Sequence, residues 1–181
     1  MPSAFRHTTT LGIAVAAMIV AGCGDKGFVN TLAGNGLVSM QDQCDSASFN
    51  AALGAGTCVK QGSVTLTAFN DELAATQKVA AWQFVPSAMT ISVGQSILAT
   101  NNGGEHHTFT EVENFGGGIV PALNTASGNP VPAPECTALS SSAQIAPGAS
   151  TTTDPASTVG TEHYQCCIHP WMRTTVTVIQ P

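Results

Sequence analysis

Charged side chains are scarce in this sequence. Only 9% of its 181 residues are charged. The chain has 5 Lys and Arg and 11 Asp and Glu, which gives a formal net charge of -6. A protein that neutralises nucleic-acid phosphates needs a basic stripe or patch, and this chain has too few cations to form one. A chain of this length buries one main core. We therefore expect no nucleic-acid partner, and a large multidomain enzyme is excluded.

The apolar stretch near the N-terminus is too short to span a bilayer. Residues 11–20 read LGIAVAAMIV and follow Arg6 and His7, a pattern typical of an export signal. The segment ends in VAGC at Cys23, which resembles the lipobox of bacterial lipoproteins. This resemblance implies that residues 1–22 are a signal peptide and that Cys23 is lipidated, which anchors the chain to a membrane in the periplasm or cell envelope. An ordinary cleaved signal and an uncleaved anchor are the alternatives.

The segment after Cys23 has no sustained periodicity. Residues 23–43 are rich in Gly, Asn and small polar residues, so we expect a flexible tether without helix or strand. Cys44 and Cys58 bracket a loop-rich stretch. In an oxidising compartment a local disulfide between them is the simplest interpretation, with two free thiols as the alternative. This bond would close an N-terminal extension over residues 44–79.

Short strand-like segments dominate the rest of the chain. They read SVTLT, KVAAWQF, MTISV, SILAT, TFTEV and TTVTVIQ. Asn70 is expected to cap a short helix through DELAATQ. Residues 115–161 are rich in Gly, Pro, Ser and Thr and are predicted to be loops, with one short helix near residues 135–141. Strands joined by such turns favour an antiparallel sandwich or barrel over residues 80–181.

Soft metal ligands are concentrated in one loop near the C-terminus. Residues 164–173 read YQCCIHPWMR and offer a thiolate, an imidazole and a thioether. Two histidine nitrogens, one thiolate and a weak thioether make up the blue-copper ligand set, so a second histidine must come from elsewhere. One is available in NNGGEHHTFT. Zinc favours several thiolates or histidines and calcium favours oxygen, so copper is the predicted metal.

Two segments resemble the small cupredoxins, the plastocyanin and amicyanin group. Residues 84–110 match the Phe-x-Pro opening, the paired asparagines and the first histidine, and residues 164–178 match the Tyr-x-Cys-x2-His-x2-Met loop. The resemblance implies an all-β, Greek-key sandwich or barrel, to which an N-terminal disulfide-closed extension with a short helix is added. It also implies one copper ion, held by His107, Cys166, His169 and Met172. His107 is preferred to His106 because the family's ligand follows the paired asparagines by a fixed step.

Two positions depart from the family's pattern. Thr174 stands where the family usually has glycine, and Thr108 stands where it often has asparagine. Both positions lie next to the ligands, where hydrogen bonds tune a metal site. A threonine hydroxyl can donate or accept a hydrogen bond, so the site is expected to persist, and its reduction potential is left open.

The six cysteines are assigned by their chemistry. Strand alternation places Cys166 on the same face as Tyr164 and Cys167 on the opposite face. With Cys23 given to lipid and Cys166 to copper, four cysteines are left. We predict two disulfides, Cys44 with Cys58 and Cys136 with Cys167. A vicinal bond between Cys166 and Cys167, which would destroy the copper site, and crossed pairings are the alternatives.

These features predict a monomeric, exported carrier of single electrons that meets redox partner proteins transiently. The resemblance implies that His169 exposes an imidazole edge through an apolar patch formed by Pro170 and Trp171, although Trp171 could simply pack under the loop. The sequence of the extension does not define its role; capping of the barrel and formation of a docking surface are the two alternatives.

Two other functional classes compete with an electron carrier. A copper enzyme is disfavoured because His7 is expected to leave with the signal peptide, so that only His106 and His163 remain for further copper centres. Met172 also fills the axial position. A copper-sequestering or delivery protein is the alternative function, although the five methionines are scattered and form no Met-rich tract.

Overall fold

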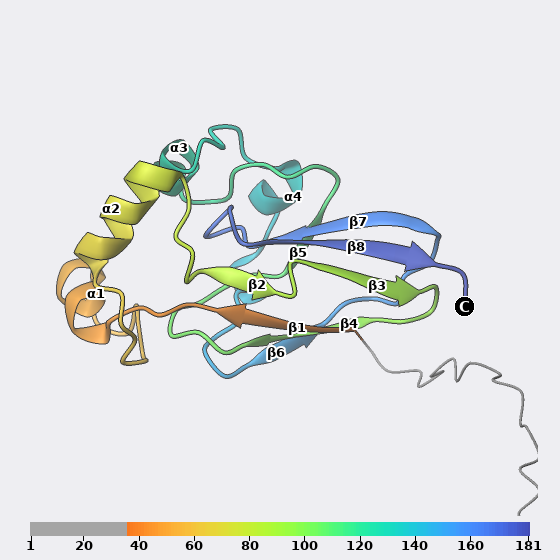
Figure 1. Ribbon diagram of the computed structural model, residues 1–181, viewed down its shortest axis with the longest axis horizontal. Helices are drawn as coiled ribbons and strands as arrows, with labels where there is room; N and C mark the ends of the chain where they lie inside the picture. The colour runs from red at the N-terminus through yellow and green to blue at the C-terminus, as the bar shows by residue number, and fades with distance from the viewer. Residues whose placement is uncertain (1–35) are drawn as a thin grey trace, which may run out of the picture. The chain divides into compact units, whose positions relative to one another are not determined.

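The computed structural model describes residues 36–181, in which two four-stranded β-sheets face each other (Figure 1). One sheet has the order β2-β1-β4-β6, with strands Gln83–Val85, Gly36–Gln41, Ile97–Asn101 and Ser150–Thr152. The other has the order β3-β8-β7-β5, with strands Ala88–Ser92, Arg173–Ile179, Gly160–Gln165 and Thr110–Val112. The expected β-sandwich is confirmed.

Alternating side chains build the core between the sheets. In β8 the residues Thr174, Val176 and Val178 are buried, and in β4 the residues Ile97 and Ala99 meet the same core. Each fully buried Val or Ile contributes about 1.5–3 kcal/mol relative to an exposed one. The two-residue period in TTVTVIQ and SILAT therefore specifies both the strands and the inward faces.

The strand directions differ from the purely antiparallel arrangement that was expected. β1 runs parallel to β4, and β3 runs parallel to β8, whereas the other ladders are antiparallel. Parallel neighbours require long crossover connections. In both parallel pairs the two strands are separated by other strands in the chain, which supplies those connections.

The expectation of a structureless tether over residues 23–43 is wrong for residues 36–41. These residues form β1, which pairs with β2 and β4, and its Val38 and Met40 are buried. Val38 and Met40 are the two buried apolar residues of the strand, and two residues among the surrounding Gly and Asn are too few to make the strand pattern recognisable in the sequence. Residues 1–35, with the expected signal peptide and Cys23, lie outside the described residues.

The extension contains two helices rather than one. Helix α1 spans Ser46–Leu53 and helix α2 spans Leu66–Thr76. Thr65 caps α2, since its hydroxyl accepts a hydrogen bond from Ala68 N at 3.2 Å. The helix thus begins before Asn70, and the strand expected in SVTLT is not formed. Asp45 caps α1 in the same way, through Ser48 N at 2.9 Å, and this Asp-x-x-Ser start is the signal that could have revealed α1.

The stretch that was expected to be mostly loop contains several short elements. They are α3 (Pro121–Ala126), α4 (Pro134–Thr137), the 3-10 turn Ser141–Ala143 and strand β6. Helix α4 and the 3-10 turn fall where one short helix was expected. Strand β6 pairs with β4 and so covers an edge of the first sheet.

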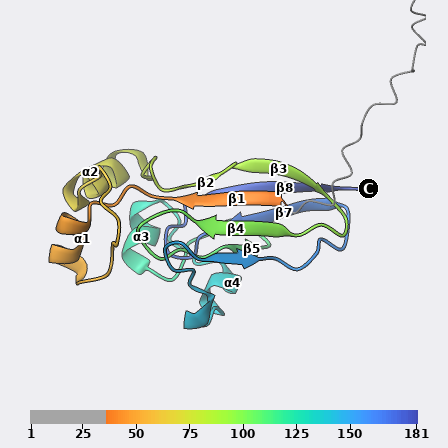
Figure 2. The same cartoon turned by 90° about the horizontal axis from the view of Figure 1, so that it is seen from below.

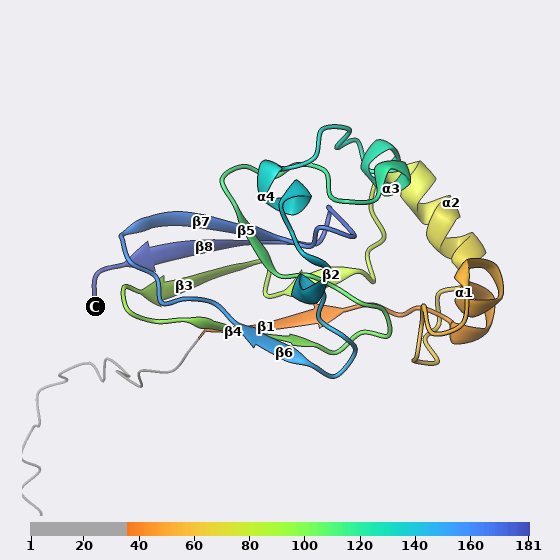
Figure 3. The ribbon, with the colours of Figure 1, turned by 180° about the vertical axis from the view of Figure 1, so that it is seen from behind.

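Helices α1 and α2 lie beyond the end of the sandwich at which β1 ends, and α3 lies near that end, as Figures 2 and 3 show. The loop between β7 and β8 reaches the same end. Among residues 36–181, none of the helices combines the length and hydrophobicity needed to cross a membrane.

Candidate metal centre

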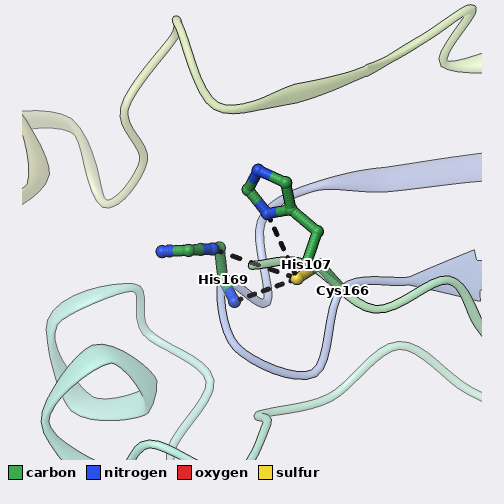
Figure 4. Close-up of side chains that lie close together, drawn as sticks. All are labelled: His107, Cys166 and His169. Atoms are coloured by element: carbon green, nitrogen blue, oxygen red, sulfur yellow. Dashed lines mark hydrogen bonds between the residues drawn. The ribbon is translucent and has the colours of Figure 1, made fainter. Parts of the chain in front are cut away.

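Three donor side chains converge at the end of the sandwich. His107 precedes β5, Cys166 directly follows β7, and His169 lies in the β7–β8 loop. The Nδ1 atoms of His107 and His169 lie 3.8 and 3.9 Å from Sγ of Cys166 (Figure 4). The three donor atoms lie within 4.8 Å of one another, and all three residues are buried. Side chains that are distant in sequence therefore form one compact cluster.

The paired-asparagine motif shapes the loop that delivers His107. Asn101 Nδ2 donates to the carbonyls of Glu105 and Ile145, each at 2.8 Å, and Asn101 Oδ1 accepts from Gly103 N at 2.9 Å. His107 and Ile145 then exchange two backbone hydrogen bonds, of 3.2 and 2.7 Å. The histidine is thus fixed by a buried amide side chain and by a backbone bridge. His106, the neighbour that was not preferred, is exposed.

Backbone hydrogen bonds close the loop that carries the other ligands. Cys166 N donates to Met172 O at 3.0 Å, and Met172 N donates to His169 O at 2.9 Å. The thiol sulfur accepts from the backbone N–H groups of Thr108, at 3.4 Å, and His169, at 3.5 Å. Met172, the expected thioether ligand, is completely buried in this loop. The loop therefore holds its side chains in place by its own backbone.

The two threonines that depart from the family's pattern both make buried hydrogen bonds. Thr108 Oγ1 accepts from Cys167 N at 2.7 Å, and Thr174 Oγ1 donates to Pro86 O at 2.8 Å. Thr108 thus ties the first histidine segment to the cysteine segment, and Thr174 ties β8 to the segment before β3. Both hydroxyls keep a structural role next to the ligands.

The adjacent cysteines have different partners. Cys167 is bonded to Cys136 of α4, and Cys44 is bonded to Cys58. Within residues 36–181, Cys166 is the only cysteine without a disulfide. Its thiol is therefore available to a metal, and neither the vicinal bond nor a crossed pairing occurs in the structure.

The His169 ring is buried, whereas an edge of this ring was expected to be exposed. His169 is only 3% exposed. Its ring centroid lies 6.4 Å from those of Phe69 in α2 and Trp82 before β2, and 5.6 Å from that of Trp171. The expectation was wrong because Phe69 belongs to the extension, which the family resemblance does not reach. Capping of the sandwich is thus a role of α2.

Two carboxylates that were not predicted from the sequence contact the Nε2 atoms of the histidines. Nε2 of His107 lies 2.9 Å from Oδ2 of Asp42, and Nε2 of His169 lies 3.4 Å from Oε2 of Glu105. Glu105 stands two residues before His107 and could have been suspected. Asp42 is 65 residues from His107 in the chain, and no sequence motif connects them.

Protonation of the cluster follows from these contacts. Burial disfavours the charged forms, but hydrogen bonds from His107 and His169 lower the pKa of the Cys166 thiol well below its usual value. Hydrogen bonds to Cys166 and Glu105 likewise outweigh burial and raise the pKa of His169 to about 9. Burial also opposes ionisation of Asp42, yet hydrogen bonds from His107 and the backbone lower its pKa to about 2. The thiol is thus held as a thiolate, the form that binds metals.

The donor set fits a copper ion. One thiolate, two imidazole Nδ1 atoms and the buried thioether of Met172 are the soft and intermediate ligands that copper prefers. The charged carboxylates contact the histidines and not Cys166, so they belong to the surroundings of the donors. His107, Cys166, His169 and Met172 are consistent with one copper ion.

No protein-family model and no curated protein matches the sequence. Among solved structures, the chain is similar to a purple cupredoxin from Nitrosopumilus maritimus, with 15% identity, coverage of 80% of this chain and 100% of that one, and a TM-score of 0.44. It is also similar to an oxidised plastocyanin from Dryopteris crassirhizoma (17% identity, 79% and 99% coverage, TM-score 0.38). A Cu(I) amicyanin mutant gives 16% identity, 56% and 78% coverage and a TM-score of 0.38. At these values, assignment of the ligands depends on this chain's own donor atoms.

Proposed function

We propose that this chain is an exported, lipid-anchored type 1 copper protein that transfers single electrons between redox partner proteins. The observation that supports this most directly is the buried cluster in which Nδ1 of both histidines faces Sγ of Cys166. A copper ion held by these residues would supply one-electron redox chemistry.

The surroundings of the cluster suit a site that changes little between two oxidation states. The two ligand loops are closed by backbone hydrogen bonds, and the Cys136–Cys167 disulfide holds the segment behind Cys166. The donors are buried, so water has little access to them. A rigid and dry donor set lowers the reorganisation that each transfer requires.

Trp171 is the most accessible aromatic contact of His169. It is half-buried, whereas Phe69 and Trp82 are buried, and its ring lies 5.6 Å from that of His169. We propose that redox partners approach the copper centre at Trp171, in a small and transient contact. The protein acts in this proposal as a monomer.

The metal assignment is tested by visible absorption of the copper-loaded protein. An intense thiolate-to-copper charge-transfer band is expected, which Cys166→Ser abolishes. His107→Asn should also remove the band, whereas His106→Asn, at the exposed neighbouring position, should leave it intact. A colourless protein after copper loading would contradict the proposal.

The proposed membrane anchor rests on the VAGC motif at Cys23, outside the described residues. Incorporation of labelled palmitate in a bacterial host should be seen in the wild-type chain and lost in Cys23→Ala. Cys166→Ala, which removes the cysteine without a disulfide among residues 36–181, is the control that should still take up label. Unlabelled wild-type protein would indicate an ordinary cleaved signal or no processing.

We propose no catalytic activity for the chain. Of the other histidines in the described residues, His106 is exposed, and the ring of His163 lies 4.7 Å from that of Phe115. Neither joins the cluster of His107, Cys166 and His169, which supports a role without additional copper centres in this chain.

Burial of His169 under α2 favours copper sequestration or delivery as the second candidate function. A covered ligand protects a bound ion but lengthens the path for an electron. Two measurements distinguish the functions: the rate of electron exchange with a soluble redox protein, and the rate of copper transfer to a chelator. Fast electron exchange with slow copper release is expected of a carrier, and the reverse is expected of a delivery protein.

A further inference from the structure

Each histidine of the cluster presents one nitrogen to the thiolate and the other to a buried carboxylate. For His107 the outer atom Nε2 is 2.9 Å from Oδ2 of Asp42, and both side chains are 0% exposed. For His169 the outer atom is 3.4 Å from Oε2 of Glu105, with side chains 4% and 9% exposed. A carboxylate so placed accepts the Nε2 proton of a metal-bound imidazole and leaves Nδ1 as the ligand atom.

The carboxylate of Asp42 is held at several points besides His107. It accepts backbone hydrogen bonds from Cys44 N at 3.1 Å, from Gly104 N at 2.8 and 2.9 Å, and from Glu105 N at 3.0 Å. The N–H groups of Gly104 and Glu105 belong to the loop that delivers His107. Asp42 therefore couples the segment after β1 to the orientation of that imidazole.

Glu105 is also held by several hydrogen bonds, through both its backbone and its side chain. Its backbone N–H donates to Asp42, and its carbonyl accepts from Asn101 Nδ2 at 2.8 Å. Its side-chain atom Oε2 accepts from Trp82 Nε1 at 2.7 Å. The charge of Glu105 is thus fixed between a buried indole and the His169 ring.

We propose that Asp42 and Glu105 are positioning residues that fix both histidines as Nδ1 ligands and lower the reduction potential of the centre. The inference rests on the proposed copper function. Reduction adds one electron to the centre, taken from a partner protein or an electrode, and so lowers its positive charge by one. Two fixed negative charges next to the Nε2 atoms of the two histidines stabilise the more positive, oxidised state more than the reduced state. The effect is large because burial weakens the solvent screening of both charges.

The first test removes the charge of Glu105 and keeps its shape. In Glu105→Gln the amide oxygen can still accept from Trp82 Nε1, so the fold should persist. The midpoint potential, measured by spectroelectrochemical titration of the copper protein, should rise by at least about 59 mV, which corresponds to a tenfold change in the equilibrium constant for one electron. Asp154→Asn, which removes an equal charge from an exposed position, should produce a much smaller shift.

The second test uses Asp42→Asn and a readout that is independent of the potential. Asparagine cannot accept all the backbone N–H groups that Asp42 binds, so folding of this variant is checked by circular dichroism. In the diamagnetic Cu(I) form, the Nε2–H proton of each histidine should give a protected, downfield NMR signal. Glu105→Gln should shift and expose the His169 signal, and Asp42→Asn should do the same for His107. Asp154→Asn should leave both signals unchanged.

The outcomes separate the inference from the function on which it rests. A wild-type chain that gives no copper spectrum overturns both. A blue, reversibly reduced wild type whose Glu105→Gln potential matches that of Asp154→Asn overturns the inference and leaves the carrier function standing. If Asp42→Asn does not fold, Glu105→Gln alone decides the matter through both readouts.

Discussion

The hydroxyl of Thr108 accepts a hydrogen bond from the backbone N–H of Cys167 at 2.7 Å. Thr108 follows the ligand His107, and Cys167 follows the ligand Cys166, so this bond joins the two ligand segments one residue beyond each donor. Both partners are buried. The bond therefore fixes the relative position of two side chains that must bind one ion.

Thr108→Val should destabilise the protein by about 1–3 kcal/mol, because the buried N–H of Cys167 loses its acceptor while the side-chain volume is kept. Urea unfolding of the copper-free protein measures the change. Thr177→Val, at an exposed position of β8, is the matched control and should change stability by less than about 0.5 kcal/mol. Equal effects of the two substitutions would show that the bond to Cys167 is unimportant.

Gly103 is required by the close approach of Asp42. The Cβ of an alanine at this position would overlap the Asp42 carboxylate and touch Nε2 of His107. Gly103→Ala should therefore displace Asp42 from the histidine and weaken copper binding about 10–100-fold, as loss of a ligand's hydrogen-bond partner does elsewhere. Competition with a Cu(I) chelator measures the affinity.

Gly36→Ala is the control for this substitution. The new Cβ there would meet the end of the flexible Met89 side chain, which can move aside, and would lie close to Cγ2 of Ile91. Its copper affinity should stay near that of the wild type. If Gly103→Ala binds copper as tightly as Gly36→Ala does, the contact between Asp42 and His107 does not support the site.

The disulfide between Cys136 and Cys167 closes a loop with a sequence separation of 31. Replacing both cysteines by alanine should lower stability by about 3–4 kcal/mol, from the entropy that the bond removes from the unfolded chain. The copper band should persist in the folded variant, because Cys166 is untouched. Urea unfolding and the visible spectrum together check both statements. A folded but colourless double variant would mean that the disulfide is needed to shape the donor set.

Local sequence signals identified part of this site and distant contacts hid the rest. Cys166, His169 and Met172 stand in one loop with a distinctive spacing, and the resemblance to the small cupredoxins selected His107 over His106. The cover over His169 could not be predicted in this way, because Phe69 lies in a helix about 100 residues earlier in the chain. Such a contact depends on the packing of the aromatic side chains and produces no hydrophobic periodicity in the sequence.

The same distinction applies to the fold. Strands β3, β4 and β8 follow from clear two-residue alternation, whereas β1 has only Val38 and Met40 to mark it. Helix α2 was predicted too short because Thr65, its actual cap, stands in a segment whose alternation favoured a strand. There the capping hydrogen bond and the burial of Phe69 and Leu73 outweighed local strand preference.

Glu111 gives the protein a predictable pH dependence. Although Glu111 is exposed at the surface, partial desolvation first, and then the charges of Glu162 and Glu135, raise the pKa of its carboxyl above the usual value. A carboxyl whose pKa is higher in the folded state favours folding while it is protonated, and this contribution is lost as the pH rises through that pKa. Glu111→Gln should therefore stabilise the protein at neutral pH, and the gain should vanish in acid.

Thermal unfolding at several pH values tests this expectation. Glu113→Gln removes an exposed carboxylate from the same segment and controls for the change in net charge. A gain that is equal in both variants, or that persists in acid, would contradict the role assigned to Glu111.

The buried ring of Phe69 lies 6.4 Å from the buried ring of His169, and its removal should open the copper centre to small reagents. Phe69→Ala should destabilise the fold by about 3–5 kcal/mol and should accelerate reduction of the oxidised copper protein by ascorbate in a stopped-flow experiment. Phe49→Ala is the matched control, because Phe49 is equally buried and packs on Phe69 and Trp82 rather than on His169. It should lower stability similarly without a comparable gain in rate. Acceleration in both variants would show that the effect comes from loosening of the whole extension. Acceleration in neither would show that the electron does not enter at Phe69, and Trp171 would then be the contact to substitute next.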